Sequence, residues 1–284
     1  MGRVSYVEYV VGEFPVVISA PHGGLLTPHE IPDRLLGVIH SDRNTQDLSR
    51  RIRNALIERT GGAPHLIVSR LHRGKLDPNR EIVEAAQGSV FAENAWYEFQ
   101  GFIEVAKDIV TRDFGSGLYL DIHGHDIDRI ELGYLLSDSD LSLSDAGLNH
   151  PALVAKSSVR ALAGTVGITL AELIRSPNSP GTLLDEAGVR TVPSAADPYP
   201  GGAAYFKGGY NTWRHGSTNG GTISGIQIEH QFPGLWDTEQ NQEVYGAILA
   251  DALVTFLEVN FALTVTGTGV ARTPHRSPQR DVRQ

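Results

Sequence analysis

The sequence contains no cysteine among its 284 residues. Disulfide bonds and thiolate metal sites are therefore excluded, and any metal ion must be bound by histidine, aspartate or glutamate. No apolar run approaches the length of about 20 residues that a bilayer-spanning helix needs. Residues 1–11 lack a basic region followed by an apolar core, so we expect no signal peptide and a cytoplasmic location.

Positive charge is also scarce, because 24 lysines and arginines face 33 aspartates and glutamates and give a net charge of −9. This balance argues against a general nucleic-acid-binding protein. Residues 71–80 are the exception, since they hold Arg73, Lys75 and Arg80 with few apolar residues. Arginine binds a carboxylate through two parallel hydrogen bonds, which suits a carboxylate-bearing substrate. The alternative is a solvated loop in which Asp77 and Arg80 pair with each other.

The chain is organised around residues 118–125, where an apolar strand pattern runs into Asp121, His123 and His125. Side chains at positions i, i+2 and i+4 of an extended segment share one face. A carboxylate beside an imidazole fixes the tautomer and orientation of a metal-binding histidine. This run therefore indicates a metal or catalytic site, and the competing interpretation is a strand end with two solvated histidines.

A second histidine, His22, follows the β-branched run of residues 15–20. Binding residues of α/β sheets collect at the carboxyl ends of strands, so His22 and His123 are expected to share a site. Asp42 precedes a helical pattern that ends at Gly61. Asp42 is either the N-cap of this helix, a position that Asn44 could also occupy, or an oxygen ligand of a metal ion. From the residues alone the two interpretations are about equal.

Other patterns predict strands over residues 65–69, 130–136 and 222–232 and long helices over 90–114 and 242–261. Shorter helices are expected over residues 154–163, 169–174 and 182–187. Residues 193–217 are predicted to be a long irregular segment, and a loop of this length is usually functional. Its Lys207, Arg214 and His215 suit a wall or lid over a polar ligand.

Glu229 lies near the end of the predicted strand 222–232 and is the candidate general base or acid. The alternative is a pairing with one of the arginines. The chain has no G-x-S-x-G elbow, no G-x-G-x-x-G after a strand and no G-x-x-x-x-G-K-[ST] loop, so serine-hydrolase and nucleotide chemistry have no support. What remains favours metal-assisted hydrolysis of an amide or ester in a small carboxylate-bearing substrate.

Six short motifs occur in the order of the N-formylglutamate amidohydrolase family, which is related to zinc carboxypeptidases and aspartoacylase-like deacylases. The resemblance spans about residues 15–232, and residues 206–210 are its most family-specific part. The motifs are Pro21-His22-Gly23-Gly24, Ser41-Asp42, Asp77-Pro78-Asn79-Arg80, Asp121-Ile122-His123-Gly124, Phe206-Lys207-Gly208-Gly209-Tyr210 and Ile228-Glu229.

The resemblance implies one zinc ion per chain, held by His22, Asp42 and His123. It further implies that Asp121 orients His123 and that Glu229 activates the attacking water and protonates the leaving amine. The other implied contacts are with substrate, for which Asn79 and Arg80 would hold a carboxylate and Arg73, Lys207 and Arg214 would line the pocket.

The chain departs from the related patterns at several positions. The zinc carboxypeptidases place a glutamate three residues after the first histidine, where this chain has Leu25, so Asp42 must supply the carboxylate, with Asp47 as its rival. Pro78 replaces the usual leucine, and Arg43 the tryptophan that often follows the aspartate. His125 has no counterpart and is assigned to the surroundings of the ligands.

We therefore expect a single α/β catalytic domain over residues 1–265 and a disordered tail over 266–284. The expected architecture is a three-layer sandwich with a mixed, mostly parallel sheet, as in the zinc carboxypeptidases. The expected activity is zinc-dependent hydrolysis of an N-acyl amino acid, with N-formyl-L-glutamate as the first candidate. The alternatives are a zinc carboxypeptidase or γ-glutamyl peptide hydrolase of the same fold, and a non-catalytic protein that binds an acidic ligand.

Overall fold

The fold is organised around a seven-stranded sheet in a computed structural model that describes residues 2, 4–165, 167–232, 234–261, 263–266 and 269–272. The order across the sheet is β1 (Val7–Val10), β3 (His65–Ser69), β2 (Val16–Ala20), β4 (Gly117–His125), β7 (Ile223–Gln231), β5 (Ile130–Gly133) and β6 (Thr191–Val192). Strands β3, β2, β4 and β7 are parallel, whereas β1 and β5 run antiparallel to their inner neighbours. The prediction of a mixed, mostly parallel sheet is confirmed.

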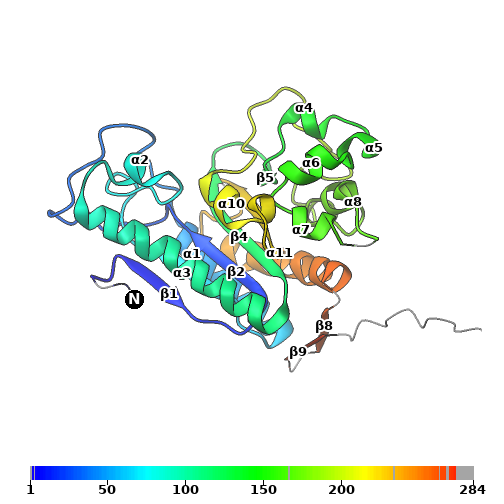
Figure 1. Cartoon of the computed structure of the whole chain (residues 1–284), viewed down its shortest axis with the longest axis horizontal. Helices are drawn as coiled ribbons and strands as arrows, with labels where there is room; N and C mark the ends of the chain where they lie inside the picture. The colour runs from blue at the N-terminus through cyan, green and yellow to red at the C-terminus, as the bar shows by residue number, and fades with distance from the viewer. Residues whose placement is uncertain are drawn as a thin grey trace, which may run out of the picture.

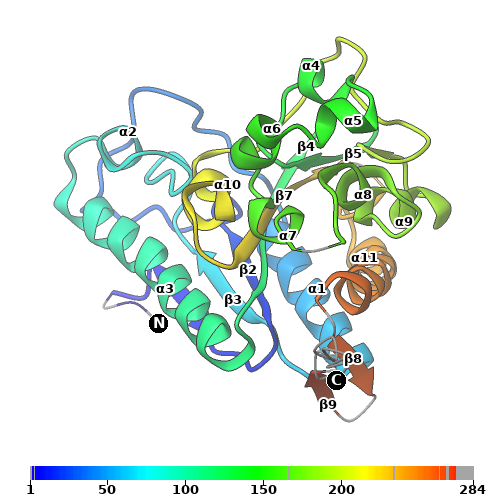
Figure 2. The same ribbon diagram turned by 45° about the vertical axis from the view of Figure 1, so that its right-hand side comes forward.

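Helices cover both faces of this sheet (Figures 1 and 2). Helix α3 (Val90–Phe114) lies on one face, and α1 (Thr45–Thr60) and α11 (Glu239–Asn260) lie together on the other. The strands serve both layers because successive side chains point to opposite faces. In β4, Tyr119 belongs to the core beneath α3, and Leu120 belongs to the core beneath α1 and α11.

The remaining helices are short. Two of them, α2 (Ile82–Ala86) and α10 (Tyr210–His215), lie near α3 (Figure 2). The others form a group on the side of β5 (Figure 2): α4 (Asp138–Leu141), α5 (Asp145–Leu148), α6 (Pro151–Lys156), α7 (Arg160–Ala163), α8 (Leu170–Arg175) and α9 (Pro180–Glu186). The 3-10 turn η1 covers Ser217–Asn219.

The structure corrects three sequence-based expectations. The irregular segment over residues 193–217 contains helix α10, and the strand expected over 130–136 ends at Gly133. The proposed tail of residues 266–284 includes Thr266 of β8 (Leu263–Thr266) and all of β9 (Gly269–Arg272), which pair with each other, so disorder is wrong for these five residues. Residues 267–268 and 273–284 lie outside the described residues, and so does the rest of that prediction.

Within the described part of the chain, no helix combines the length and the apolar character that crossing a bilayer requires.

Candidate metal centre and pocket

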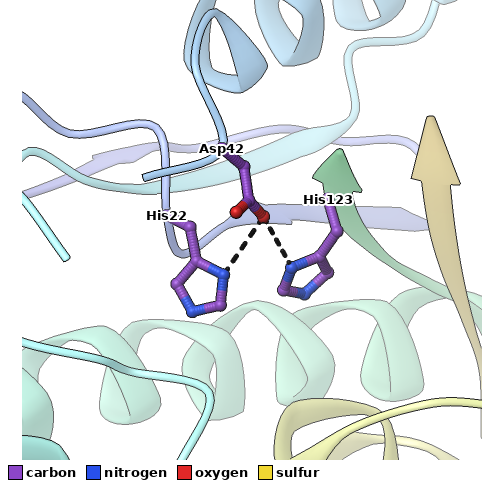
Figure 3. Close-up of side chains that lie close together, drawn as sticks. All are labelled: His22, Asp42 and His123. Atoms are coloured by element: carbon purple, nitrogen blue, oxygen red, sulfur yellow. Dashed lines mark hydrogen bonds and ion pairs between the residues drawn. The ribbon is translucent and has the colours of Figure 1, made fainter. Parts of the chain in front are cut away.

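Three side chains from separate parts of the sequence meet where the parallel strands end. His22 follows β2, His123 lies near the end of β4, and Asp42 precedes α1. The Asp42 backbone N–H donates to the His22 carbonyl oxygen at 3.2 Å, which holds the two loops together. Asp42 Oδ2 lies 3.2 Å from His22 Nδ1 and 3.1 Å from His123 Nδ1, so the two rings present the same nitrogen to one carboxylate oxygen (Figure 3).

The outer nitrogens of both rings are held by buried carboxylates. His22 Nε2 lies 2.6 Å from Asp77 Oδ1, and His123 Nε2 lies 2.9 Å from Asp121 Oδ2. Asp77 and Asp121 are both fully buried. A carboxylate can only accept a hydrogen bond, so each ring donates from Nε2 and directs Nδ1 inward. This is the arrangement that fixes a metal-binding histidine in its ligating tautomer.

The donor set fits a divalent metal ion. When the rings are neutral, the two Nδ1 atoms and Asp42 Oδ2 are three lone-pair atoms that converge within 4.8 Å of one another. Such a convergence requires positive charge at its centre, and two imidazoles with one carboxylate form a catalytic zinc donor set. Among the described residues, this is the group of histidine and acidic side chains that could hold an ion.

The charge balance supports the same conclusion. Four carboxyl groups gather here against two buried guanidinium groups: Asp42, Asp77, Asp121 and Glu229, with Arg34 and Arg73. Burial opposes ionisation of the three aspartates, but the neighbouring histidines lower their pKa values overall. Burial opposes protonation of His123, but Asp121 and Asp42 raise its pKa well above the usual value, so its proton offsets part of this negative charge, and a divalent cation would replace that proton.

Glu229 faces the same centre from the neighbouring strand, because β4 and β7 pair His123 with Glu229. It is 5% exposed, and Gln227 donates to its Oε1 at 2.8 Å. Burial raises the pKa of Glu229 to about 7, while His123 acts to lower it and Asp42 to raise it. No arginine pairs with Glu229 among the described residues, so that alternative is wrong, and Glu229 instead lines the pocket beside the centre.

The centre opens into a pocket of about 940 Å³ whose wall includes Arg73, Asn79, Arg80 and Lys207. Arg73 is neutralised, since its Nε lies 3.0 Å from Asp77 Oδ2 and its Nη1 3.3 Å from Asp42 Oδ1. It therefore holds the carboxylates in place. Arg80 is about one-third exposed and contacts exposed Glu84, while Lys207 is exposed, so these two cations remain accessible to an anionic ligand.

Asn79 occupies the boundary between the pocket and the buried core. Its Oδ1 accepts a hydrogen bond from the Asn211 backbone N–H at 2.8 Å, and its Nδ2 lies 3.3 Å from His123 Nε2. The alternative in which Asp77 and Arg80 form a solvated pair is wrong, because Asp77 is fully buried against His22 and Arg73.

The structure separates two predicted residues from this centre. Arg214 does not line the pocket, because α10 directs it to the face of Trp96, 5.4 Å from the ring centroid, and to the hydroxyl of Tyr210. The expectation that Arg214 lines the substrate pocket is therefore wrong. Asp47, the rival of Asp42, is exposed on α1 and lines a different cavity.

His125 lies in the pocket wall but does not contact the three converging side chains. Its Nε2 lies 3.2 Å from the Glu229 carbonyl oxygen, and its ring centroid is 5.7 Å from that of Phe206. The N-cap alternative for Asp42 is also settled, because Asn44 occupies that position at the start of α1.

Sequence reasoning missed the partners that surround the centre. The sequence indicates Asp77 only as part of a family motif and as a possible partner of Arg80, because Asp77 lies well past the end of β3. No sequence pattern points to Asn211, yet it links Asn79 to Gln100 and to Asp121 through hydrogen bonds. Gln227 was noted only as a polar position of its strand, yet it joins Glu229 to the Gly209 backbone N–H.

Comparison with known proteins finds solved structures that are similar in fold. No protein-family model matches the chain, and no curated protein matches its sequence. A solved N-formylglutamate amidohydrolase from Ralstonia eutropha JMP134 is similar with a TM-score of 0.51 at 13% identity, covering 90% of this chain and 98% of the other. A gene product from Agrobacterium tumefaciens gives a TM-score of 0.49 at 15% identity, over 89% and 94% of the two chains. The chain thus has the fold seen in the Ralstonia N-formylglutamate amidohydrolase.

Proposed function

We propose that this protein is a zinc-dependent amidohydrolase that cleaves the amide bond of an N-acyl amino acid, with N-formyl-L-glutamate as the first candidate substrate. The observation that carries the proposal is the convergence of His22 Nδ1, His123 Nδ1 and Asp42 Oδ2 beside the buried Glu229. The fold shared with the Ralstonia amidohydrolase is consistent with it.

The residues of the centre would have different roles in hydrolysis. His22, Asp42 and His123 would hold the ion, which, when bound, supplies Lewis acidity that polarises a carbonyl and acidifies water. Glu229 would accept the proton of the attacking water at Oε2 and deliver it to the leaving nitrogen. Gln227 fixes Glu229 through Oε1, so the carboxylate reaches the reacting atoms from a rigid strand.

A substrate carboxylate would be held by cations of the pocket wall. Arg80 offers a planar guanidinium whose Nη1 is fixed by the Asn79 carbonyl oxygen at 2.7 Å. Lys207 adds an exposed ammonium on another wall of the same pocket. Fixing the carboxylate positions the amide over the ion and Glu229, which lowers the entropic part of the barrier.

The first experiment is metal analysis of purified wild-type and His123→Ala proteins by mass spectrometry, followed by a panel of amides. We expect about one zinc per wild-type chain, lost in the variant, together with hydrolysis of N-acyl amino acids. Hydrolysis confined to C-terminal peptide bonds or γ-glutamyl bonds would replace the proposal with a peptidase. Stoichiometric zinc without turnover would indicate a binding protein, and no zinc after reconstitution would overturn the metal centre.

The role of Glu229 is tested with Glu229→Gln, for which Asp126→Asn is a matched control in the same pocket wall. The first variant should keep zinc and lose activity by about 100-fold to 10,000-fold, the usual range for a general acid–base. The control should stay near wild type, because Asp126 is exposed. An active Glu229→Gln protein would remove Glu229 from the reaction.

A further inference from the structure

The pocket wall carries large apolar side chains that folding leaves in solvent. Leu25 is 79% exposed, Val38 47% and Phe206 45%, and all three line the pocket that contains the metal centre. Exposed apolar side chains in the wall of a concave site are available to an apolar part of a ligand. The charged groups of a glutamate substrate would make no apolar contact with these side chains.

Each of these side chains is presented by a backbone that the fold fixes. Next to Leu25, the Leu26 N–H donates to the Arg70 carbonyl oxygen, and the Leu26 carbonyl oxygen accepts from the His72 N–H, both at 2.9 Å. The Val38 carbonyl oxygen accepts a hydrogen bond from buried Arg34 at 2.8 Å. The apolar wall beside the Leu25 loop is therefore pre-formed.

Phe206 is fixed in a similar way on the wall beside β4. Its backbone N–H donates to Glu131 Oε2 at 2.8 Å, and Glu131 is fully buried and paired with Arg129. The Phe206 ring packs near His125, which follows the metal-binding candidate His123 by two residues in β4. An apolar group bound near Phe206 would therefore lie next to the reacting centre.

The same pocket offers positive charge for the other half of the ligand. Arg43 and Lys207 are exposed, line the pocket and have no ionic partner among the described residues, and Arg80 is partly exposed. In an N-acyl amino acid the carboxylate belongs to the amine half of the amide. The cations therefore suit the amine half, and the apolar side chains are left for the acyl half.

The pocket volume agrees with a two-part ligand. About 940 Å³ lies at the upper end of the range of roughly 300–1,000 Å³ in which proteins enclose drug-sized molecules. A formyl group adds one carbon to the amino acid and would contact little of the apolar wall.

We infer that the substrate is an N-acyl amino acid whose acyl group is an apolar chain of several carbons, bound by Leu25, Val38 and Phe206. The inference rests on the amide hydrolysis proposed above. In that reaction water adds to the acyl carbonyl, the C–N bond breaks, the nitrogen leaves with a proton, and the products are a short-chain carboxylate and an amino acid.

The test compares binding and turnover across matched acyl lengths with the zinc-loaded protein. Calorimetry uses non-cleavable ketone analogues of N-acetyl-, N-butyryl- and N-hexanoyl-L-glutamate, in which a methylene replaces the amide nitrogen. Turnover uses the formyl, acetyl, butyryl and hexanoyl amides. Each fully buried methylene strengthens binding by about threefold to fourfold, so we expect butyryl to bind about tenfold more tightly than acetyl.

Variants test whether the apolar side chains of the pocket wall cause the increase in affinity with acyl length. Leu25→Asn and Phe206→Ser should remove most of the gain with chain length, whereas Leu35→Asn should retain it, because Leu35 is 88% exposed and lies outside the pocket. Affinity that stays flat or falls with acyl length in the wild type would overturn the inference. If affinity rises with acyl length but no amide is hydrolysed, the proposed function is overturned. If only the formyl amide is hydrolysed rapidly and affinity does not change with acyl length, only the inference is overturned.

Discussion

At the scale of single residues, His22 and His123 are distinguished by having both ring nitrogens engaged. A surface histidine rotates freely, but each of these rings lies between Asp42 and a second, fully buried carboxylate. The ring orientation is therefore set before any ion binds. The affinity of the centre for zinc should consequently depend on residues that never touch the ion.

Asp77→Asn tests this dependence. The substitution preserves shape but removes the charge that holds His22 Nε2, so zinc affinity should fall about 10-fold to 100-fold. The measurement is a competition titration against a chelator, with a thermal melt to verify folding. Asp47→Asn is the control, because Asp47 is exposed on α1 and should leave the affinity unchanged. Equal affinities in the Asp77 variant and the wild type would deny Asp77 this role.

Arg80 and Arg214 form a matched pair for substrate recognition. Arg80 lines the pocket and Arg214 lies against Trp96 outside it. Arg80→Ala should therefore raise KM for acidic substrates and lower kcat/KM about 10-fold or more, in line with the roughly 1.5–3 kcal/mol of a hydrogen bond to a charged group. Arg214→Ala should change neither. The measurement is steady-state kinetics on acidic and uncharged amides. An equal loss of kcat/KM on both classes would show that Arg80 does not bind the substrate carboxylate.

The residues that meet at the centre were predictable where a strand end supplies them. His22, His123 and Glu229 each lie at or just past the end of an apolar β-run, so local pattern and strand direction suffice. Arg214 was misplaced because its direction depends on a tertiary contact between α10 and α3. The role of Asp77 leaves no local pattern because its buried partner His22 is 55 positions away.

At the scale of elements, the strong periodic patterns predicted the strands and helices that build the scaffold. Strand β3 and helix α3 match their predicted ranges, since an unbroken apolar run and a long 3.6-residue pattern are the clearest signals. Helix α10 was missed because the glycine-rich residues 201–209 conceal its start, and β6 has only two residues. Such elements depend on neighbours that sequence pattern does not reveal.

Substitution of two glycines in these elements by alanine should change the free energy of unfolding in opposite directions. A Cβ at Gly133 of β5 would lie 2.5 Å from the Gly208 backbone nitrogen, so Gly133→Ala should lower the free energy of unfolding by about 1–3 kcal/mol. A Cβ at Gly101 of α3 meets nothing within 4 Å, so Gly101→Ala should raise it by about 0.5–1 kcal/mol. Urea unfolding measures both. Similar effects of the two substitutions would contradict the close approach of β5 to residues 207–208.

At the scale of the whole molecule, charge and burial set how folding responds to pH. His65 in β3 is fully buried, and its Nδ1 accepts from the Gly12 N–H at 3.2 Å and lies 2.9 Å from the Tyr9 hydroxyl. An atom that accepts a hydrogen bond from an amide cannot carry a proton, so the ring is neutral in the folded chain. Burial lowers the pKa of His65 to about 4 from its usual value near 6.5.

The sign of the effect on stability follows from proton binding. Between pH 6.5 and 4 the unfolded chain binds a proton at His65 and the folded chain does not, so the free energy of unfolding decreases as the pH falls. This residue contributes at most about 1.4 kcal/mol per pH unit. His65→Gln should flatten the pH dependence in this window, measured by urea unfolding at half-unit steps, whereas His29→Gln should not, because His29 is exposed. An unchanged slope in His65→Gln would show that other buried histidines, such as His230 with its pKa lowered to about 3, dominate the response.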